Sequence, residues 1–163
     1  MNEIFNKSRV RFLRYWKNIF LQISLAIITI YIVLLFLSIE HAVIISSIAA
    51  TAFIVFTMPN SITARPKNVI GGHLIGLLTG LFSTLLYSYY INNILVYAFA
   101  VGLSIFLMIL TDTEHPPASG TALGVSIKGF TSDVIIAVVT SSIILSLFHQ
   151  LFKKFLIDLA RTK

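Results

Sequence analysis

The chain has 163 residues, 57% of them apolar and only 11% charged, and its mean hydropathy is +0.93. A soluble domain carries about 25% charged residues, so this composition indicates a polytopic membrane protein and excludes an ordinary soluble domain. The sequence contains no cysteine, which excludes disulfides and thiolate metal sites. The net charge of +6 lies mostly at the two ends, where basic residues mark cytoplasmic flanks and meet anionic lipids, so we expect no nucleic-acid partner.

The first half of the chain predicts two long helices with a short one between them. Residues 1–18 are basic and aromatic and predict an amphipathic segment at the membrane interface. Residues 19–39 are free of charge and long enough to span, since roughly 20 helical residues cross a bilayer. Residues 42–58 are shorter and rich in small and hydroxylated residues, which predicts a helix inside the bundle. After a polar loop, residues 69–90 predict the next span.

The second half repeats this order. Residues 94–110 predict a span, residues 119–130 a short apolar segment, and residues 134–152 a last span before a basic cytoplasmic tail, 153–163. Glu40-His41 and Glu114-His115 lie 74 residues apart, each at the end of a charge-free run. At this offset Ser46-Ser47 corresponds to Gly120-Thr121. We therefore expect one transmembrane domain, residues 19–152, built from two similar halves, 19–90 and 93–152.

These patterns predict an all-α transmembrane bundle with four long spans and two short or broken helices. Basic residues at both termini predict that both are cytoplasmic, which requires an even number of crossings. Six crossings give inverted halves, and four give parallel halves. Six is favoured because it leaves only Lys128 outside, whereas four would leave three basic residues there.

The stretch from Leu110 to Gly124 gathers two carboxylates, a histidine, two prolines and several small residues. Ionisable groups at membrane depth are costly and usually functional. Pro117 suits the first position of a helix, and the residues after it would present unpaired backbone N–H groups that attract an anion. The alternative is that the two prolines only terminate the preceding span.

His73 is the second polar candidate and follows Gly71 and Gly72. It could bind an anion, relay a proton or only hydrogen-bond a neighbouring helix. The predicted solute-binding residues share this region and its counterpart in the first half: His115, Pro116, Pro117, Ser119, Gly120, Thr121, His73, Gly71, Gly72, Ser46 and Ser47. Gly72, Gly76 and Gly80 share one helix face and predict a packing seam.

Charged residues around these candidates predict electrostatic or gating roles: Arg65, Lys67, Asp112, Glu114 and Lys128. Arg65 and Lys67 could equally be ordinary positive-inside anchors, and Lys128 could pair with Asp133 or Glu114. A less favoured alternative is a metal site made by Asp112, Glu114 and His115, with His41 or His73 as a further ligand.

Two motifs resemble the HPP family of integral membrane proteins. These are Thr111-Asp-Thr-Glu-His-Pro-Pro-Ala-Ser-Gly-Thr-Ala-Leu-Gly124 and Arg65-Pro-Lys-Asn-Val-Ile-Gly-Gly-His73. The likeness covers about residues 19–152. It implies a four-span membrane protein, and some plastid and cyanobacterial members are implicated in nitrite transport. Asp112, Glu114 and the Ala118-Ser119 pair depart from the pattern, because acids are not expected there and glycines are usual at 118–119.

The expected function is therefore a transporter or channel for a small inorganic anion, with nitrite suggested by the resemblance. The alternatives are a non-transporting scaffold or accessory protein and a cation or metal-ion carrier. The chain lacks the common hydrolase, P-loop and dinucleotide motifs, so we expect neither an enzyme nor a cofactor. We expect a multi-pass protein of the plasma or inner cell membrane. We also expect a homo-oligomer whose interface is supplied by the glycine seams.

Overall fold

A computed structural model describes residues 2–36, 42–86 and 93–159, and in these ranges the chain is helical without strands. Six α-helices follow one another: α1 (Asn2–Phe36), α2 (Ala42–Thr57), α3 (Pro66–Leu85), α4 (Asn93–Leu110), α5 (Pro117–Lys128) and α6 (Ser132–Phe152). Short 3-10 turns are η1 (Ile62–Ala64) and η2 (Lys153–Phe155). The predicted all-α class is confirmed.

Four of these helices have the length and hydropathy to cross a bilayer. Their apolar stretches are Phe12–Val33, Pro66–Leu85, Asn93–Leu110 and Ser132–Phe155. Helices α2 and α5 have only 16 and 12 residues, and at 1.5 Å per residue both fall short of a hydrocarbon core of about 30 Å. The prediction of four long and two short helices is confirmed, whereas six crossings stay a prediction.

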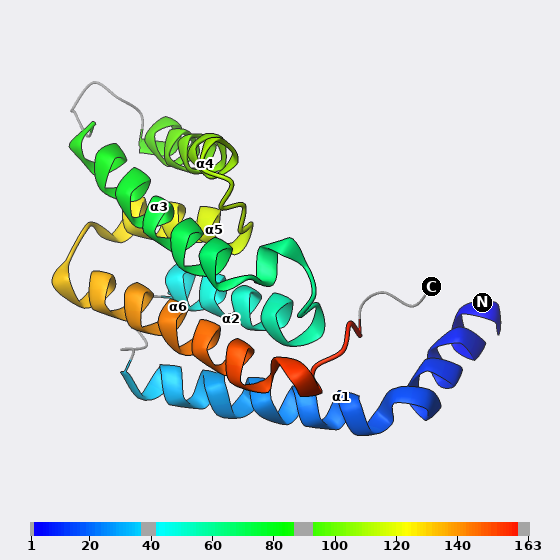
Figure 1. Cartoon of the computed structure of the whole chain (residues 1–163). Helices are drawn as coiled ribbons and strands as arrows, with labels where there is room; N and C mark the ends of the chain where they lie inside the picture. Colours follow the sequence, from blue (N-terminus) through cyan, green and yellow to red (C-terminus); the bar gives the residue numbers. More distant parts are fainter. Residues whose placement is uncertain (1, 37–41, 87–92, 160–163) are drawn as a thin grey trace.

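The helices form a bundle in which α1 and α4 lie on opposite sides (Figure 1). Helix α1 packs on α2 and α6, and α4 packs on α3 and α5. In the middle of the bundle, α2 and α3 each contact both α5 and α6. Nine of the fifteen buried residues in the main hydrophobic cluster come from α2 and α6, so this cluster lies between the two halves of the chain.

Proline and a left-handed residue account for three of the helix ends. Helices α3 and α5 each carry proline in the first turn, where its missing N–H would have no helical partner in any case. Helix α4 ends at Leu110, just before Asp112, whose φ of 54° is left-handed. The Thr113 N–H then reaches back to the Met108 carbonyl at 3.0 Å, which caps the helix and turns the chain inward.

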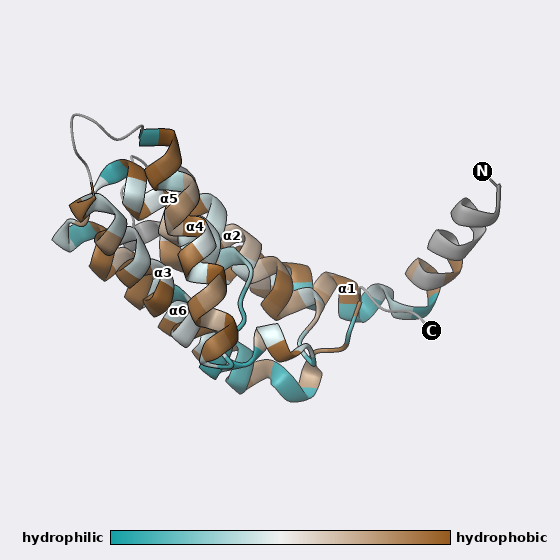
Figure 2. Ribbon diagram, turned by 90° about the horizontal axis from the view of Figure 1, so that it is seen from above, coloured by the Kyte–Doolittle hydropathy of each residue, from teal (hydrophilic) through white to brown (hydrophobic). Residues whose placement is uncertain are grey.

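The outer surface of the bundle is apolar, as a lipid-facing surface must be. Figure 2 shows hydrophobic residues along the helices and hydrophilic ones mainly at their ends. Large exposed apolar side chains lie on α1 and α4, among them Phe20, Ile27, Leu95, Phe99, Phe106 and Ile109. The predicted basic segment 1–18 is not separate from the first span, because residues 2–36 form one continuous helix.

The glycine seam of α3 packs against α5 of the same chain. A Cβ on Gly76 would lie 2.5 Å from the Ala118 carbonyl oxygen, and one on Gly80 would lie 2.5 Å from the Val125 Cβ. Only glycine allows the two helices to approach so closely. The seam is therefore a packing seam as predicted, but its assignment to a homo-oligomer interface is wrong, because α5 already occupies it.

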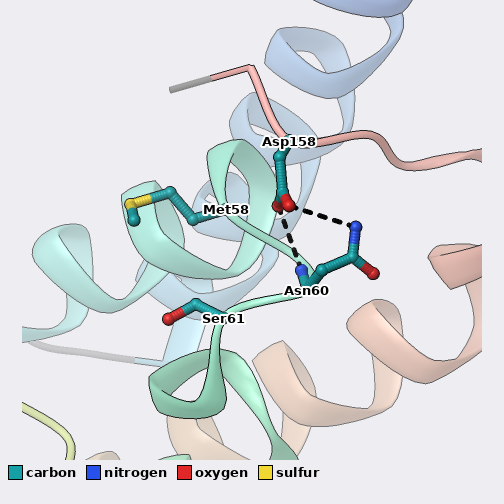
Figure 3. Close-up of a pocket in the computed structure, with 4 residues that line it drawn as sticks. All are labelled: Met58, Asn60, Ser61 and Asp158. Carbon is teal, nitrogen blue, oxygen red and sulfur yellow. Dashed lines mark hydrogen bonds between the residues drawn. The ribbon is translucent and has the colours of Figure 1, made fainter. Parts of the chain in front are cut away.

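The end of the chain returns to the turn after α2. The Leu159 N–H donates to the Thr57 carbonyl at 2.9 Å, and the Asp158 carboxylate accepts bonds from the Asn60 backbone N–H and side-chain amide at 3.1 and 3.3 Å. Figure 3 shows the two bonds between Asp158 and Asn60, beside Met58 and Ser61. Residues 156–159 thus pack on the bundle, while 160–163 lie outside the described residues, as does the predicted pair Glu40-His41.

Candidate functional site

Two histidines from different halves meet inside the bundle. His73 lies on α3 and His115 lies in the connection before α5. Their ring centroids are 5.1 Å apart, and the side chains are 1% and 0% exposed. A Cβ on Gly72 would lie 2.7 Å from the His115 Cβ, so the glycine next to His73 makes this approach possible. The structure thus brings together the two histidines that the sequence analysis named, and their part in solute binding stays a prediction.

Hydroxyl groups from α2 and α5 connect the two rings. The Thr51 Oγ1 lies 2.9 Å from Nε2 of both His73 and His115. On the other side of His73, its Nδ1 lies 2.8 Å from the Thr121 Oγ1, which is 2.9 Å from the Ser47 Oγ. Each of these polar side chains is at least 96% buried, so each must find its partner within the protein.

Both ends of this cluster are backbone carbonyls. The Ser47 hydroxyl donates to the Pro117 carbonyl, and the His115 Nδ1 lies 2.8 Å from the carbonyl of Thr63 in η1. A carbonyl can only accept, so His115 carries its proton on Nδ1 when it is neutral. All four ring nitrogens of the pair therefore have a protein partner.

The start of α5 differs from the prediction that the residues after Pro117 present unpaired backbone N–H groups to an anion. Instead, the Ala118 N–H donates to the His115 carbonyl at 2.9 Å, and the Ser119 N–H donates to the Pro116 carbonyl at 3.1 Å. Tight turns of this kind satisfy the first donors of a helix, so in this conformation these two N–H groups are not free for a ligand.

The other predicted solute-binding residues divide between the cluster and its surroundings. Ser47 and Thr121 belong to the cluster, and Gly120 faces Ser47, since a Cβ added to Gly120 would lie only 3.3 Å from the Ser47 Cβ. Pro117 is buried and Gly71 packs against Thr113. Ser46 lies on the exposed side of α2, so the structure does not bring it to the histidines.

An apolar groove between α4 and α5 leads to the histidine connection. It has a volume of about 450 Å³ and is lined by Ile105, Met108, Ile109, Glu114, His115, Pro116 and Ser119. Across Pro116, a second apolar groove lies between α2 and α5 and is lined by Ala50, Phe53, Ile54, Pro116 and Pro117. Ser119 and Pro116, both predicted to meet the solute, therefore line the outside of the cluster rather than its interior.

The charged candidates lie away from the pair. Lys67 and Asp112 form an ion pair at 2.8 Å in which both side chains are largely exposed. The hydrogen bond from Lys67 lowers the pKa of the Asp112 carboxyl, and the charges of Lys67 and Arg65 add to this. Glu114 is half-buried, whereas Arg65 and Lys128 are exposed. None of these residues contributes a side chain to the hydrogen bonds of the histidine cluster.

The alternative metal site does not assemble from its described members, Asp112, Glu114, His115 and His73. Among the described residues, no three histidine or acidic side chains come together in a way that could hold a metal ion. Asp112 is turned toward Lys67 while His115 is buried. His41, the further ligand considered, lies outside the described residues.

Sequence reasoning missed Thr51 and the Thr63 carbonyl. In the sequence, Thr51 is only one of several small residues in its segment. Its position four residues after Ser47 is a usable signal, because this spacing places both hydroxyls on one helix face. A backbone carbonyl such as that of Thr63 leaves no mark in the side-chain pattern.

The comparisons agree with this architecture. The family model described as "HPP, transmembrane region" matches residues 8–159. A transmembrane protein of Dictyostelium discoideum is 41% identical over 85 residues, which cover 52% of this chain and 30% of that protein. A second transmembrane protein of the same organism is 34% identical over 86 residues, covering 52% and 27%.

The matched stretch spans less than a third of the length of either relative. No solved structure matches the chain. The family match covers nearly the whole chain and includes both histidine motifs, most of α1 and all of the other five helices. The chain therefore belongs to the HPP transmembrane family of integral membrane proteins.

Proposed function

We propose that this protein is a membrane transporter for a small inorganic anion, with nitrite as the candidate substrate. The observation that carries the proposal is the buried pair of His73 and His115, joined by Thr51 where α2, α3 and α5 meet. Polar side chains inside a membrane domain are costly and are usually kept for function. A bundle that served only as a scaffold could be filled with apolar side chains at lower cost.

The route to the pair would start in the groove between α4 and α5. His115 and Ser119 line this groove together with apolar side chains of α4. Because every ring nitrogen of the pair already has a protein partner, a bound solute would have to replace one hydroxyl. The conformation described here is then the closed one, and α5 would have to move to admit the solute.

The donor set favours an anion over a cation. Hydroxyl and imidazole N–H groups can all donate hydrogen bonds to a small oxyanion. Asp112, which would repel an anion, is bound to Lys67 and is exposed. A cation carrier would need several oxygen ligands or a carboxylate at the pair, and the Glu114 side chain makes none of the pair's hydrogen bonds.

Several further expectations form part of the same proposal. The protein acts by transport and not by catalysis, spans the cell membrane several times and places both termini in the cytoplasm. It functions as a homo-oligomer, whose interface must use a surface other than the glycine seam of α3.

Flux measurements in proteoliposomes test the function. The purified chain is reconstituted, and the influx of nitrite, chloride and a divalent cation is compared with that into empty liposomes. His73→Gln and His115→Gln should each abolish the anion flux. His149→Gln is the matched control, because His149 is also a buried histidine but bonds the Pro59 carbonyl outside the cluster.

Each result has a defined meaning. Nitrite flux that both histidine variants lose and the control retains supports the proposal. Flux of the divalent cation alone would identify a cation carrier instead, and no flux of any ion above empty liposomes would identify a scaffold. Nitrite flux that survives both histidine substitutions would show that the site has been placed wrongly.

A further inference from the structure

The histidine cluster is one continuous chain of six hydrogen bonds between two backbone carbonyls. From the Pro117 carbonyl it runs through Ser47, Thr121, His73, Thr51 and His115 to the Thr63 carbonyl. Five side chains therefore form six links. Thr51 also lies 3.0 Å from the Ser47 carbonyl, a branch that offers its hydroxyl a further acceptor.

A count of protons shows that this chain of hydrogen bonds has one proton too few. Each hydroxyl carries one proton, and so does each neutral imidazole. Five side chains thus supply five protons, whereas six links need six, because neither terminal carbonyl can donate. In the neutral state one link always brings two lone pairs face to face, and this costs free energy in a buried site.

One additional proton satisfies every link. Starting from the Pro117 carbonyl, Ser47 must donate to it, Thr121 to Ser47, and His73 Nδ1 to Thr121. At the other end, the His115 Nδ1–H must donate to the Thr63 carbonyl. Two arrangements that satisfy all six links are then possible, one with the charge on His73 and one with it on His115. In both, the Thr51 hydroxyl donates to a ring nitrogen rather than to the Ser47 carbonyl. They differ only in the position of that proton and in the direction of the Thr51 hydroxyl.

A second additional proton is disfavoured. It would place two positive charges on rings whose centroids are 5.1 Å apart in a buried site, and like charges at this separation oppose protonation. The groups hydrogen-bonded to the pair are the hydroxyls of Thr51 and Thr121 and the Thr63 carbonyl, and the Ser47 hydroxyl bonds Thr121. None of these titrates near neutral pH. The nearest charged neighbours in the sequence are Glu114 and the Asp112–Lys67 pair, outside the chain of hydrogen bonds.

We propose that His73, Thr51 and His115 form a relay that binds one proton and passes it between the two halves of the protein. In the transfer, the Nε2–H bond of His73 breaks and its proton forms an O–H bond on Thr51. The original O–H bond of Thr51 breaks, and its proton forms the Nε2–H bond of His115. One proton enters Thr51 and one leaves, so charge and atoms balance. Thr51 is thus the positioning residue that makes the exchange possible.

The relay extends the proposed function, since one proton carried with one monovalent anion would make transport electroneutral. This last step rests on the proposed function, but the relay itself does not. Its test therefore uses proton binding rather than flux, so that failure of the relay and failure of the transport proposal can be told apart.

Nitrogen NMR of the full chain in lipid nanodiscs provides the measurement. With ¹⁵N-labelled histidine, the four histidines of the sequence are assigned through single His→Gln variants. The sample is then titrated from about pH 8 to about pH 4, which brackets the ordinary histidine pKa. We expect His73 and His115 to change together with one midpoint, and their imidazolium populations to add up to one per chain.

Substitution of Thr51 isolates the relay. Thr51→Val keeps the shape but removes the hydroxyl, and it should split the shared transition into two separate ones. Thr79→Val is the control, because its buried hydroxyl bonds only carbonyls of its own helix, Ile75 and Gly76. It should leave the shared midpoint in place.

Two independent midpoints in the native chain would overturn the proposal, as would uptake of two protons by the pair or of none. A shared midpoint that survives Thr51→Val would also overturn it. If Thr51→Val does not fold, the stoichiometry measured on the native chain still decides the outcome.

Discussion

Ser47 and Thr121 are hydrogen-bonded at 2.9 Å although they are 74 residues apart. This separation equals the offset that relates the two halves in the sequence, so equivalent residues touch each other. The helix contacts show the same relation: if α1, α2 and α3 are exchanged with α4, α5 and α6, the set of contacting pairs is unchanged. Two halves related by a twofold rotation have this contact pattern, with like residues meeting at the axis.

The Ser47–Thr121 contact leads to a stability prediction. Thr121→Val removes the hydroxyl between Ser47 and His73 Nδ1 and leaves a buried ring nitrogen without its partner. We expect the free energy of unfolding to fall by about 1–3 kcal/mol, measured as a lower midpoint of unfolding in detergent. Thr79→Val should have little effect, because that hydroxyl bonds only its own helix. Equal effects of the two variants would show that the cluster adds no stability.

Sequence reasoning predicted the fold class and the order of four long and two short helices. It did not predict that the basic segment 1–18 continues into the first span as one helix. It named the two histidines that meet in the bundle, and their role in solute binding stays a prediction. Charge-free runs and proline positions are local signals, and they placed all six helices. The partner of the glycine seam was predicted wrongly, because small residues at four-residue spacing show that a helix is approached closely but not by which helix. The state of the α5 N-terminus was also missed, since the turn that satisfies its first N–H groups depends on the conformation of the His115–Pro116 connection.

Gly76→Ala should separate α3 from α5. The added methyl would lie 2.5 Å from the Ala118 carbonyl oxygen, which is backbone and cannot move alone. We expect overpacking to lower the free energy of unfolding by about 1–3 kcal/mol, seen as a lower unfolding midpoint. Gly102→Ala is the matched control, since nothing lies within 4 Å of the methyl that it would add. Helix propensity alone should leave the control unchanged or raise its stability. If Gly102→Ala lowered the unfolding midpoint as much as Gly76→Ala does, the close packing of α3 on α5 would not explain the loss.

The Lys67–Asp112 pair gives a pH dependence with a defined sign. Because Lys67 lowers the pKa of Asp112, the pair adds stability above the ordinary aspartate pKa, about 4, and loses it as the pH falls through the lowered value. Asp112→Asn keeps a residue that tolerates the left-handed φ of 54° and removes only the charge. At neutral pH, the Asp112→Asn variant should unfold at a lower temperature than the native chain. In strong acid, the two should unfold at the same temperature.

Salt provides the control for this electrostatic effect. Both side chains are exposed, so high ionic strength should shrink the difference between Asp112→Asn and the native chain. A difference that persists in high salt or in strong acid would point to the backbone turn rather than to the charge. Asp112→Ala, which keeps no polar group to support the left-handed turn, should melt below Asp112→Asn at every pH.

Gln22 holds the end of the chain against α1. Its side-chain amide donates to the carbonyls of Phe56 and Ile157 at 2.7 and 2.8 Å, so Gln22→Leu would remove both bonds and free residues 156–159 from the bundle. The exposed Lys153 and Lys154 would then become more accessible to trypsin, because cleavage needs a locally opened chain. We expect faster tryptic removal of the C-terminal residues from Gln22→Leu in detergent. Gln150→Leu, at an exposed position of α6, should be cut at the native rate. Equal rates for both variants would show that the segment is held by its other contacts, to Thr57 and Asn60.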